Sequence, residues 1–195
     1  MQLQTFLGAL AVCIGFISYV PYFRDMFAGR TKPHVFSWVV WAVLGGIVAG
    51  IQIENGAGAG AWASAASAFL AGSVALYALR YRDTTITTID WVYFLGACIS
   101  LILWLVANNP LLAVIFVVLT DGFAFASTFR KSWNAPFDET LSVYYLSALK
   151  FFIAIFALQE VNVVTILDPF YLVIANVSFT LFTLWRRRAL RSKTS

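Results

Sequence analysis

Three polar side chains stand in the middle of long apolar runs, where a charge or an unpaired amide is costly. They are Asp121, Lys150 and Asn176. Counting from the basic boundary of each run, a helical rise of about 1.5 Å per residue puts all three roughly 13–15 Å deep, near the middle of a hydrocarbon core of about 30 Å. Charges at that depth usually pair with one another or line a water-filled cavity. These residues are therefore candidates for binding a solute or carrying a proton.

Asp121 and Lys150 lie on successive apolar runs at the same depth, so we expect them to face each other. Two roles are open. In the first, Asp121 exchanges protons or Lys150 neutralises an anionic solute. In the second, the two form a permanent buried pair that only fixes the helices, and burial alone does not make such a pair stabilising. Their counterparts in the first half of the chain are Gly15 and Gly45, which are expected to bring the first two helices close together.

Aromatic and hydroxyl side chains complete the candidate binding set. Trp41 and Tyr145 are interpreted as pocket residues, with Trp41 at a depth that reaches Asn176. Trp38 and Trp133 are interpreted as anchors at the membrane interface, where tryptophan is common. The predicted substrate-binding residues are Asn176, Trp41, Tyr145, Asp121, Lys150 and Ser67.

The histidine and cysteine residues give little support to catalysis or metal binding. His34 is the only histidine, and the two cysteines, Cys13 and Cys98, lie far apart inside apolar runs. A histidine-based metal site, a Ser-His-Asp triad or a disulfide framework is therefore not expected. The chain also has no Walker motif. We expect no catalytic residue, no metal and no cofactor, and so no enzyme.

The composition shows what kind of element must hold these residues. The 195 residues are 61% apolar and 11% charged, whereas soluble domains have about 25% charged residues. So little charge cannot cover a surface that faces water, while a surface that faces lipid needs none. The sequence therefore predicts an integral membrane protein, and the net charge of +4 is interpreted as a sign of topology and not of nucleic-acid binding.

Seven apolar runs are close to the roughly 20 residues that a transmembrane helix needs. Twelve of the 13 basic residues fall on connections at one side, and the other side carries Glu54, Glu160 and Asp168 without any base. The positive-inside rule then predicts an outside N-terminus and a cytoplasmic C-terminus in the inner (plasma) membrane. The expected spans are 3–23, 35–53, 61–79, 86–107, 111–129, 141–158 and 169–185.

An internal repeat is visible at an offset of about 105 residues. Three pairs of segments match: 23–37 with 129–142, 52–55 with 159–162, and 79–80 with 185–186. Two three-helix units joined by one helix enter the membrane in the same sense, and such parallel repeats place a solute site between them near the midplane. The expected all-α organisation is a first repeat (1–82), a linker helix (83–109), a second repeat (110–188) and a basic cytoplasmic tail (189–195).

This arrangement resembles the SWEET and PQ-loop (MtN3-like) transporter superfamily, whose repeats are parallel. The resemblance rests on Tyr19-Val20-Pro21-Tyr22, on Pro33 and Pro136 before spans two and six, and on Asn176 in span seven. The chain also resembles small bacterial membrane proteins. The superfamily implies alternating-access transport of a sugar-like or other small polar solute, with Asn176 facing the solute.

Gating is predicted from residues near the cytoplasmic ends of the helices. Prolines interrupt helical hydrogen bonds, so Pro21, Pro33 and Pro136 are expected to let helices one, two and six bend. Tyr19 is expected to close the cytoplasmic side of the pathway.

Two other functions fit the same sequence. One is a seven-helix receptor that binds a ligand without moving it, and the other is a vitamin uptake facilitator similar to PnuC, with Trp38 and Trp41 as an aromatic clamp. The identity of the solute, the direction of movement, proton coupling and homo-oligomer formation stay open.

Overall fold

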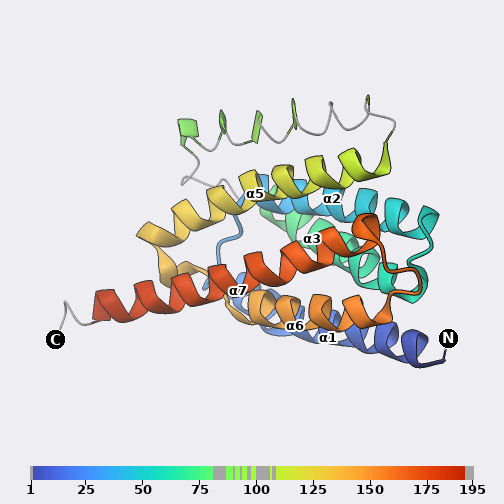
Figure 1. Ribbon diagram of the computed structural model, residues 1–195. Coiled ribbons are helices and arrows are strands. Elements are labelled where there is room, and N and C mark those ends of the chain that lie inside the picture. Colours follow the sequence, from blue (N-terminus) through green and yellow to red (C-terminus); the bar gives the residue numbers. More distant parts are fainter. Residues whose placement is uncertain are drawn as a thin grey trace.

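The computed structural model describes residues 2–80 and 109–191, together with residues 87–89, 91, 92, 94, 95, 98, 99 and 106 between them. Most of the expected linker helix (83–109) and residues 192–195 of the tail lie outside this description. All elements of the described part are helical (Figure 1). They are α1 (Gln2–Phe27), α2 (Val35–Glu54), η1 (Gly58–Ala61), α3 (Trp62–Ala78), α5 (Pro110–Asn134), η2 (Pro136–Asp138), α6 (Ser142–Ala157) and α7 (Val163–Arg191).

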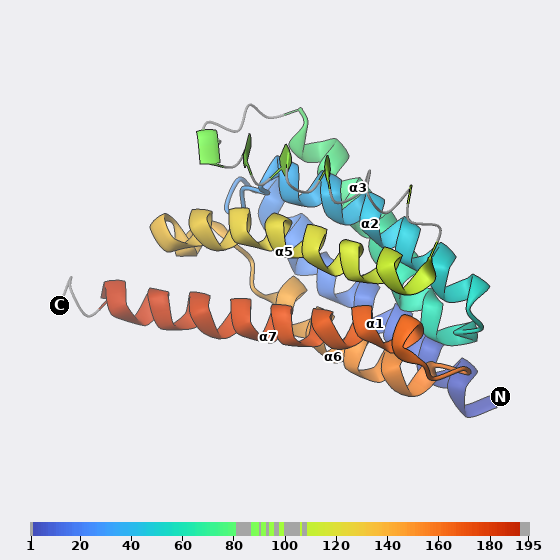
Figure 2. The same cartoon turned by 45° about the horizontal axis from the view of Figure 1, so that its top comes forward.

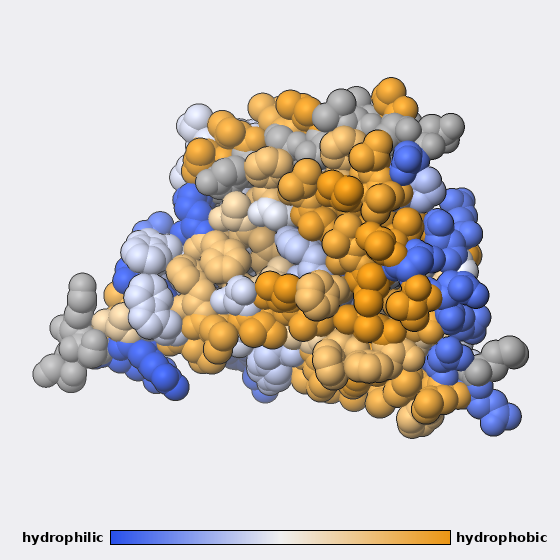
Figure 3. Space-filling model, viewed as in Figure 1, coloured by the Kyte–Doolittle hydropathy of each residue, from blue (hydrophilic) through white to orange (hydrophobic). Residues whose placement is uncertain are grey.

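Five helical segments are long and apolar enough to cross a membrane: α1, α2, η1 with α3, α5 and α7. The apolar helix α6 is shorter, with 16 residues. Figure 3 shows apolar side chains across the middle of one face, with hydrophilic ones gathered towards its ends. Apolar surface on this scale is not typical of a protein in water, so the chain is a membrane-embedded, multi-pass protein. Exposed large apolar residues include Leu3, Phe6, Ile17, Phe69, Leu76 and Leu181.

Helix α7 differs most from the expected span, because it begins before Pro169 and not at it. The Asn162 side chain accepts a hydrogen bond from the backbone N–H of Thr165 at 3.1 Å, which is the usual way to start a helix. Pro169 therefore lies inside α7, and the preceding Asp168 is a buried helical residue. The interpretation of Asp168 as a loop acid was wrong.

In each group of three helices, the third packs between the other two. Helix α3 contacts α1 and α2, and α7 contacts α5 and α6 (Figure 1, Figure 2). Among the described residues the backbone of α1 does not approach that of α2, nor that of α5 the backbone of α6. Aromatic side chains bridge α1 and α2, with the ring centre of Tyr22 5.0 Å from that of Trp38. Between the groups, α1 packs on α6 and α2 on α5. This pattern is unchanged when α1, α2 and α3 are exchanged for α5, α6 and α7.

Two hydrogen bonds between the groups are related in the same way. The Ser37 hydroxyl on α2 donates to the carbonyl of Ala124 on α5 at 2.7 Å, and the Ser142 hydroxyl on α6 donates to the carbonyl of Ser18 on α1 at 3.4 Å. The serines are 105 residues apart and the carbonyls 106. Residues at the repeat offset thus make equivalent contacts.

The connections also meet in pairs, one pair at each end of the bundle. At the end that carries the basic residues, Lys32 N donates to Asp138 O at 3.1 Å, which joins the α1–α2 and α5–α6 connections. At the other end, Glu160 N donates to Gly56 O at 3.1 Å, which joins the α2–α3 and α6–α7 connections.

Gly15 and Gly45 do not bring α1 and α2 together, so that expectation was wrong. A Cβ atom on Gly15 would lie 3.4 Å from Cδ of Lys150 on α6, and one on Gly45 would lie 3.1 Å from Cβ of Ala68 on α3. Gly15 therefore makes room for a helix of the other group, and Gly45 makes room for the next helix along the chain, α3. Gly15 in particular leaves space for the side chain of a buried lysine.

Candidate functional site

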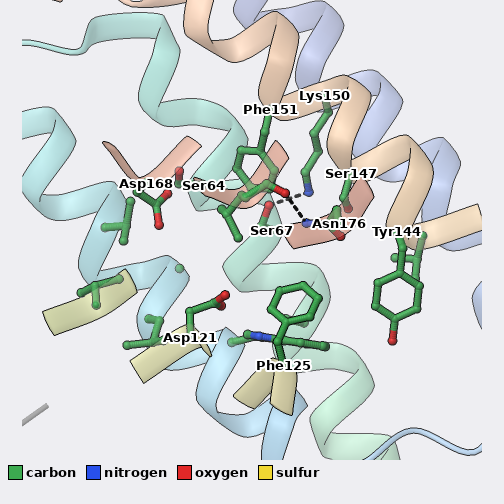
Figure 4. A pocket seen from close by; sticks show the side chains of 18 of the residues that line it. Ser64, Ser67, Asp121, Phe125, Tyr144, Ser147, Lys150, Phe151, Asp168 and Asn176 are labelled. Carbon is green, nitrogen blue, oxygen red and sulfur yellow. Dashed lines mark hydrogen bonds between the residues drawn. The ribbon is translucent and has the colours of Figure 1, made fainter. Parts of the chain in front are cut away.

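A cavity lies in the interior of the bundle, where α2, α3, α5, α6 and α7 come together (Figure 4). The space open to the centres of water-sized molecules is about 80 Å³, whereas one water needs roughly 10–15 Å³. The cavity can therefore hold several waters or a small solute. Its polar lining consists of Ser64, Ser67, Asp121, Ser147, Lys150, Asp168 and Asn176.

Five of the six predicted binding residues line this cavity: Trp41, Ser67, Asp121, Lys150 and Asn176. The sixth, Tyr145, lies outside it with 51% of its side chain exposed, while Tyr144 is 3% exposed and lines the cavity. The reason is helical phase, because adjacent residues are rotated by about 100°. Steps of three residues back from Lys150 lead to Ser147 and then to Tyr144, on the inward face of α6.

Trp38 also lines the cavity, so its interpretation as an interfacial anchor was wrong. Its side chain is buried, and its ring lies edge-on to that of Trp41, with centroids 5.1 Å apart. The two residues are three positions apart on α2 and share a helix face. Trp133, by contrast, is exposed, and the Arg186 guanidinium lies 4.4 Å from the centre of its ring.

Lys150 is buried to 1% exposure, and its ammonium is held by a hydroxyl group. Its Nζ donates to Oγ of Ser67 at 2.6 Å and lies 4.7 Å from the ring centre of Phe151. It forms no salt bridge with any residue that the structure describes. An ammonium has three N–H donors, so this bond leaves donors for a further partner.

Asp121 and Asp168 place two buried carboxylates on α5 and α7. In each, Oδ2 is buried and has no hydrogen-bond partner within the described part of the chain. The two are close enough for their charges to interact, and Asp121 also lies beside Trp41 and Tyr171. Buried polar atoms are nearly always satisfied, so these oxygens point to a bound partner.

The expected pair of Asp121 and Lys150 does not form. The two side chains enter from different sides of the cavity (Figure 4), and their helices do not pack together because α7 lies between them. Neighbours along the chain are thus not neighbours in the bundle. Asn176 lies on α7 and donates from Nδ2 to the carbonyl of Leu172 at 2.8 Å, which fixes its amide at the cavity wall.

At the basic end, a buried polar network ties the connections to the helices. Nζ of Lys131 lies 2.7 Å from Oε1 of Glu139, with both side chains almost fully buried, and also donates to the carbonyl of Lys32. The Tyr144 hydroxyl donates to the other carboxylate oxygen of Glu139 at 3.2 Å. Because Tyr144 also lines the cavity, this network couples the wall of the cavity to the end of the bundle.

The predicted gating residues lie on the same side. Tyr19 is buried in an aromatic cluster, with its ring centre 5.9 Å from that of Trp38. Pro21 lies inside α1, where it leaves a helical carbonyl without its usual donor. Pro33 precedes α2 and Pro136 begins η2. Both lie in connections, so the expectation that they bend helices two and six was wrong.

At the opposite end, a buried glutamine links three helices. Ser64 donates to Oε1 of Gln52 at 3.0 Å, and Nε2 of Gln52 donates to the carbonyl of Thr165 at 3.3 Å. Pro169 lacks the N–H that would bond this carbonyl in a regular helix, and Gln52 supplies the missing donor. In the sequence, Gln52 is marked only by its place in the repeat.

Comparison of the chain with family models, with curated proteins and with solved structures gives no significant match. The resemblance to the SWEET and PQ-loop superfamily therefore stays a prediction.

Proposed function

We propose that this protein is a secondary transporter or facilitator that moves a small polar solute across the inner (plasma) membrane by alternating access. The observation that carries the proposal is the cavity, which places ionisable groups inside a bundle whose outer surface is apolar. Ionisable groups inside a membrane usually belong to substrate or ion pathways. The two unpartnered carboxylate oxygens favour this explanation over a purely structural role.

The packing of the helices supports two parallel repeats, residues 1–82 and 110–188, joined by a linker helix over 83–109. The contacts of α1 with α6 and of α2 with α5 are equivalent between the groups, and Ser37 and Ser142 make equivalent hydrogen bonds. In such an arrangement the solute site lies between the repeats. Helices of both groups line the cavity, as this proposal requires.

Alternating access requires one end to open while the other stays closed. The paired connections at each end provide two such closures, one on either side of the cavity. The positive-inside rule assigns the basic end to the cytoplasm. The polar network of Lys131, Glu139 and Tyr144 is then the inner closure.

The test is uptake by purified protein in sealed vesicles, with labelled sugars, amino acids, organic acids and vitamins, each with and without an imposed pH difference. We expect saturable uptake of one class. The Tyr145→Phe variant, altered outside the cavity, serves as the control and should transport normally. Saturable binding without uptake of any solute would contradict transport and favour the receptor function, while selective uptake of a vitamin would favour the PnuC-like facilitator.

A further inference from the structure

The charges that line the cavity do not balance. Its lining contains two carboxylates, from Asp121 and Asp168, and one ammonium, from Lys150. The other lining residues are uncharged: they are glycine, aliphatic and aromatic residues, including the phenol of Tyr144, together with serines and one asparagine. With the three groups ionised, the formal charge of the cavity is negative by one.

The charges are also separated within the cavity. The carboxylates come from α5 and α7 and interact with each other, whereas the ammonium comes from α6 and is held by Ser67 of α3 (Figure 4). Each carboxylate has an unpartnered oxygen, and the ammonium has N–H donors that its bond to Ser67 does not use. One side of the cavity thus offers acceptors and the other offers donors.

We infer that the solute is a small zwitterion, which binds with its ammonium at Asp121 and Asp168 and its anionic group at Lys150 and Ser67. This inference rests on the proposed function and names the class of solute. A neutral sugar leaves three buried charges without counterions, and a solute with one charge leaves the opposite side of the cavity unpaired. Unpaired buried charges are costly, so only a solute with both charges satisfies both sides.

A bound zwitterion leaves the excess negative charge of the cavity unchanged. The charges of Asp121 and Asp168 interact, so a proton on one of the two carboxylates removes the repulsion between them. One proton on the pair of Asp121 and Asp168 therefore completes the charge balance, and the zwitterion binds together with a proton.

The aromatic residues fit the cationic end of such a solute. Trp41 lies beside Asp121, where the solute's ammonium would bind. The ring centres of Trp38 and Phe125 lie 5.1 and 5.0 Å from the ring centre of Trp41. Aromatic faces attract ammonium groups, most strongly where water is excluded.

The experiment measures equilibrium binding to the full chain in lipid nanodiscs by calorimetry. The probes are the standard amino acids, with glucose and ribose as neutral solutes. For each amino acid that binds, its amide is the matched cation and its 2-hydroxy acid the matched anion. We expect saturable binding of at least one amino acid, with both analogues weaker by about 30-fold or more. No saturable amino-acid binding, or an equally tight sugar or analogue, overturns the inference.

Two variants test which wall recognises which charge. Lys150→Met should reduce amino-acid affinity to that of the amide and leave amide binding unchanged, whereas Asp168→Asn should reduce it to that of the hydroxy acid. The controls are Lys32→Met and Asp138→Asn, which alter an ion pair of 3.3 Å outside the cavity and should change neither affinity. If Lys150→Met does not fold, Ser67→Ala tests the same wall. An unchanged preference for the zwitterion in these variants overturns the assignment.

Uptake of the same amino acid into vesicles separates this inference from the proposed function. Binding without uptake removes transport and keeps the zwitterion site. Uptake of a sugar by a protein that binds no zwitterion keeps transport and removes the site.

Discussion

Lys150 is a buried cation whose position depends on two small residues. Ser67 accepts the hydrogen bond of the ammonium while its own hydroxyl donates to the carbonyl of Ala63 at 2.7 Å. Gly15 leaves the space that the lysine stem occupies. The Ser67 hydroxyl is thus fixed by the backbone of α3 and in turn fixes the ammonium of Lys150 on α6 at the cavity wall.

The Ser67→Ala variant should lower the free energy of unfolding by about 1–3 kcal/mol, because it leaves a buried charged donor without its partner. Ser73→Ala is the matched control on the same helix, since Ser73 is not fully buried and its exposed hydrogen bond goes to the carbonyl of Phe69 in its own helix. We expect a change within about 0.5 kcal/mol there. Chemical unfolding in detergent micelles measures both, and equal effects would show that Ser67 does not support the lysine.

Asp121 is expected to carry the proton in any pH-driven uptake. The titratable groups around it are Asp168 and Tyr171 of α7, together with Lys150 on another side of the cavity, while α2 presents the non-titrating Trp41. In the unaltered protein an acidic exterior should accelerate uptake, because one proton on the carboxylate pair removes the excess negative charge of the cavity. Asp121→Asn cannot exchange a proton, so uptake should no longer respond to the imposed pH difference.

Vesicle uptake at equal and unequal pH measures this response, and solute exchange at equal pH shows that the variant is folded. Asp138→Asn, at the basic end, is the control and should retain the response. An Asp121→Asn protein that still responds fully would leave Asp168 as the proton carrier.

At the scale of the elements, the missing hydrogen bond at Pro169 inside α7 is replaced by contacts with two other helices. Pro169 cannot donate to the carbonyl of Thr165, and Gln52 of α2 donates to it instead while accepting from Ser64 of α3. The Thr165 carbonyl, which loses its helical donor at Pro169 beside Asp168, therefore receives a hydrogen bond from α2. This link holds Asp168 in position at the cavity.

A double-mutant cycle tests the link. Gln52→Leu should cost about 1–3 kcal/mol in the free energy of unfolding, since it leaves the Thr165 carbonyl buried without a donor. In a Pro169→Ala background the alanine N–H can bond that carbonyl, so the cost of Gln52→Leu should fall by about 0.5 kcal/mol or more. Additive costs would show that the glutamine and the proline act independently. Unfolding of the four proteins in the same detergent measures the cycle.

The sequence predicted which segments are helical better than how the helices turn and pair. Apolar runs indicate a helix but not its rotation, so Tyr145 was chosen where Tyr144 faces the cavity, and Trp38 was placed at the interface. A proline favours the start of a helix, so the sequence places Asp168 before a span, whereas the cap formed by Asn162 lies upstream and makes Asp168 a helical residue.

The error over Asp121 and Lys150 has a different physical origin. Helices joined by a short connection were assumed to pack together, but α7 inserts between α5 and α6. The order of helices in a bundle depends on contacts between residues far apart in sequence, which no local pattern specifies. Both residues nevertheless line the same cavity, although they do not pair.

For the molecule as a whole, the two ends are closed by different chemistry. The basic end is held by the buried ion pair of Lys131 and Glu139. The other end is held by backbone hydrogen bonds, such as the one from Glu160 N to Gly56 O, and by close packing, since a Cβ on Gly60 would lie 2.5 Å from Cδ2 and 3.0 Å from Cα of Leu158. Because the closures do not share residues, each can be weakened without altering the other.

Glu139→Gln should open the basic end, because a buried lysine that loses its counterion costs about 3–5 kcal/mol. Gly60→Ala should open the other end, since its side chain cannot fit against the Leu158 backbone without a shift. The reporter is Ser147→Cys in the cavity, in a chain that also carries Cys13→Ser and Cys98→Ser. A membrane-impermeant thiol reagent is added to one side of oriented vesicles.

We expect Glu139→Gln to raise the rate of labelling from the basic side by about tenfold or more, and Gly60→Ala to raise it from the opposite side. Asp138 lies in the same connection as Glu139 but pairs at the surface with Lys32. The Asp138→Asn variant should therefore leave both labelling rates unchanged. Labelling from both sides at once in either variant would indicate a continuous channel. Faster labelling from the same side in both variants would mean that the cavity has a single entrance, and two closures that open in turn could not then explain transport.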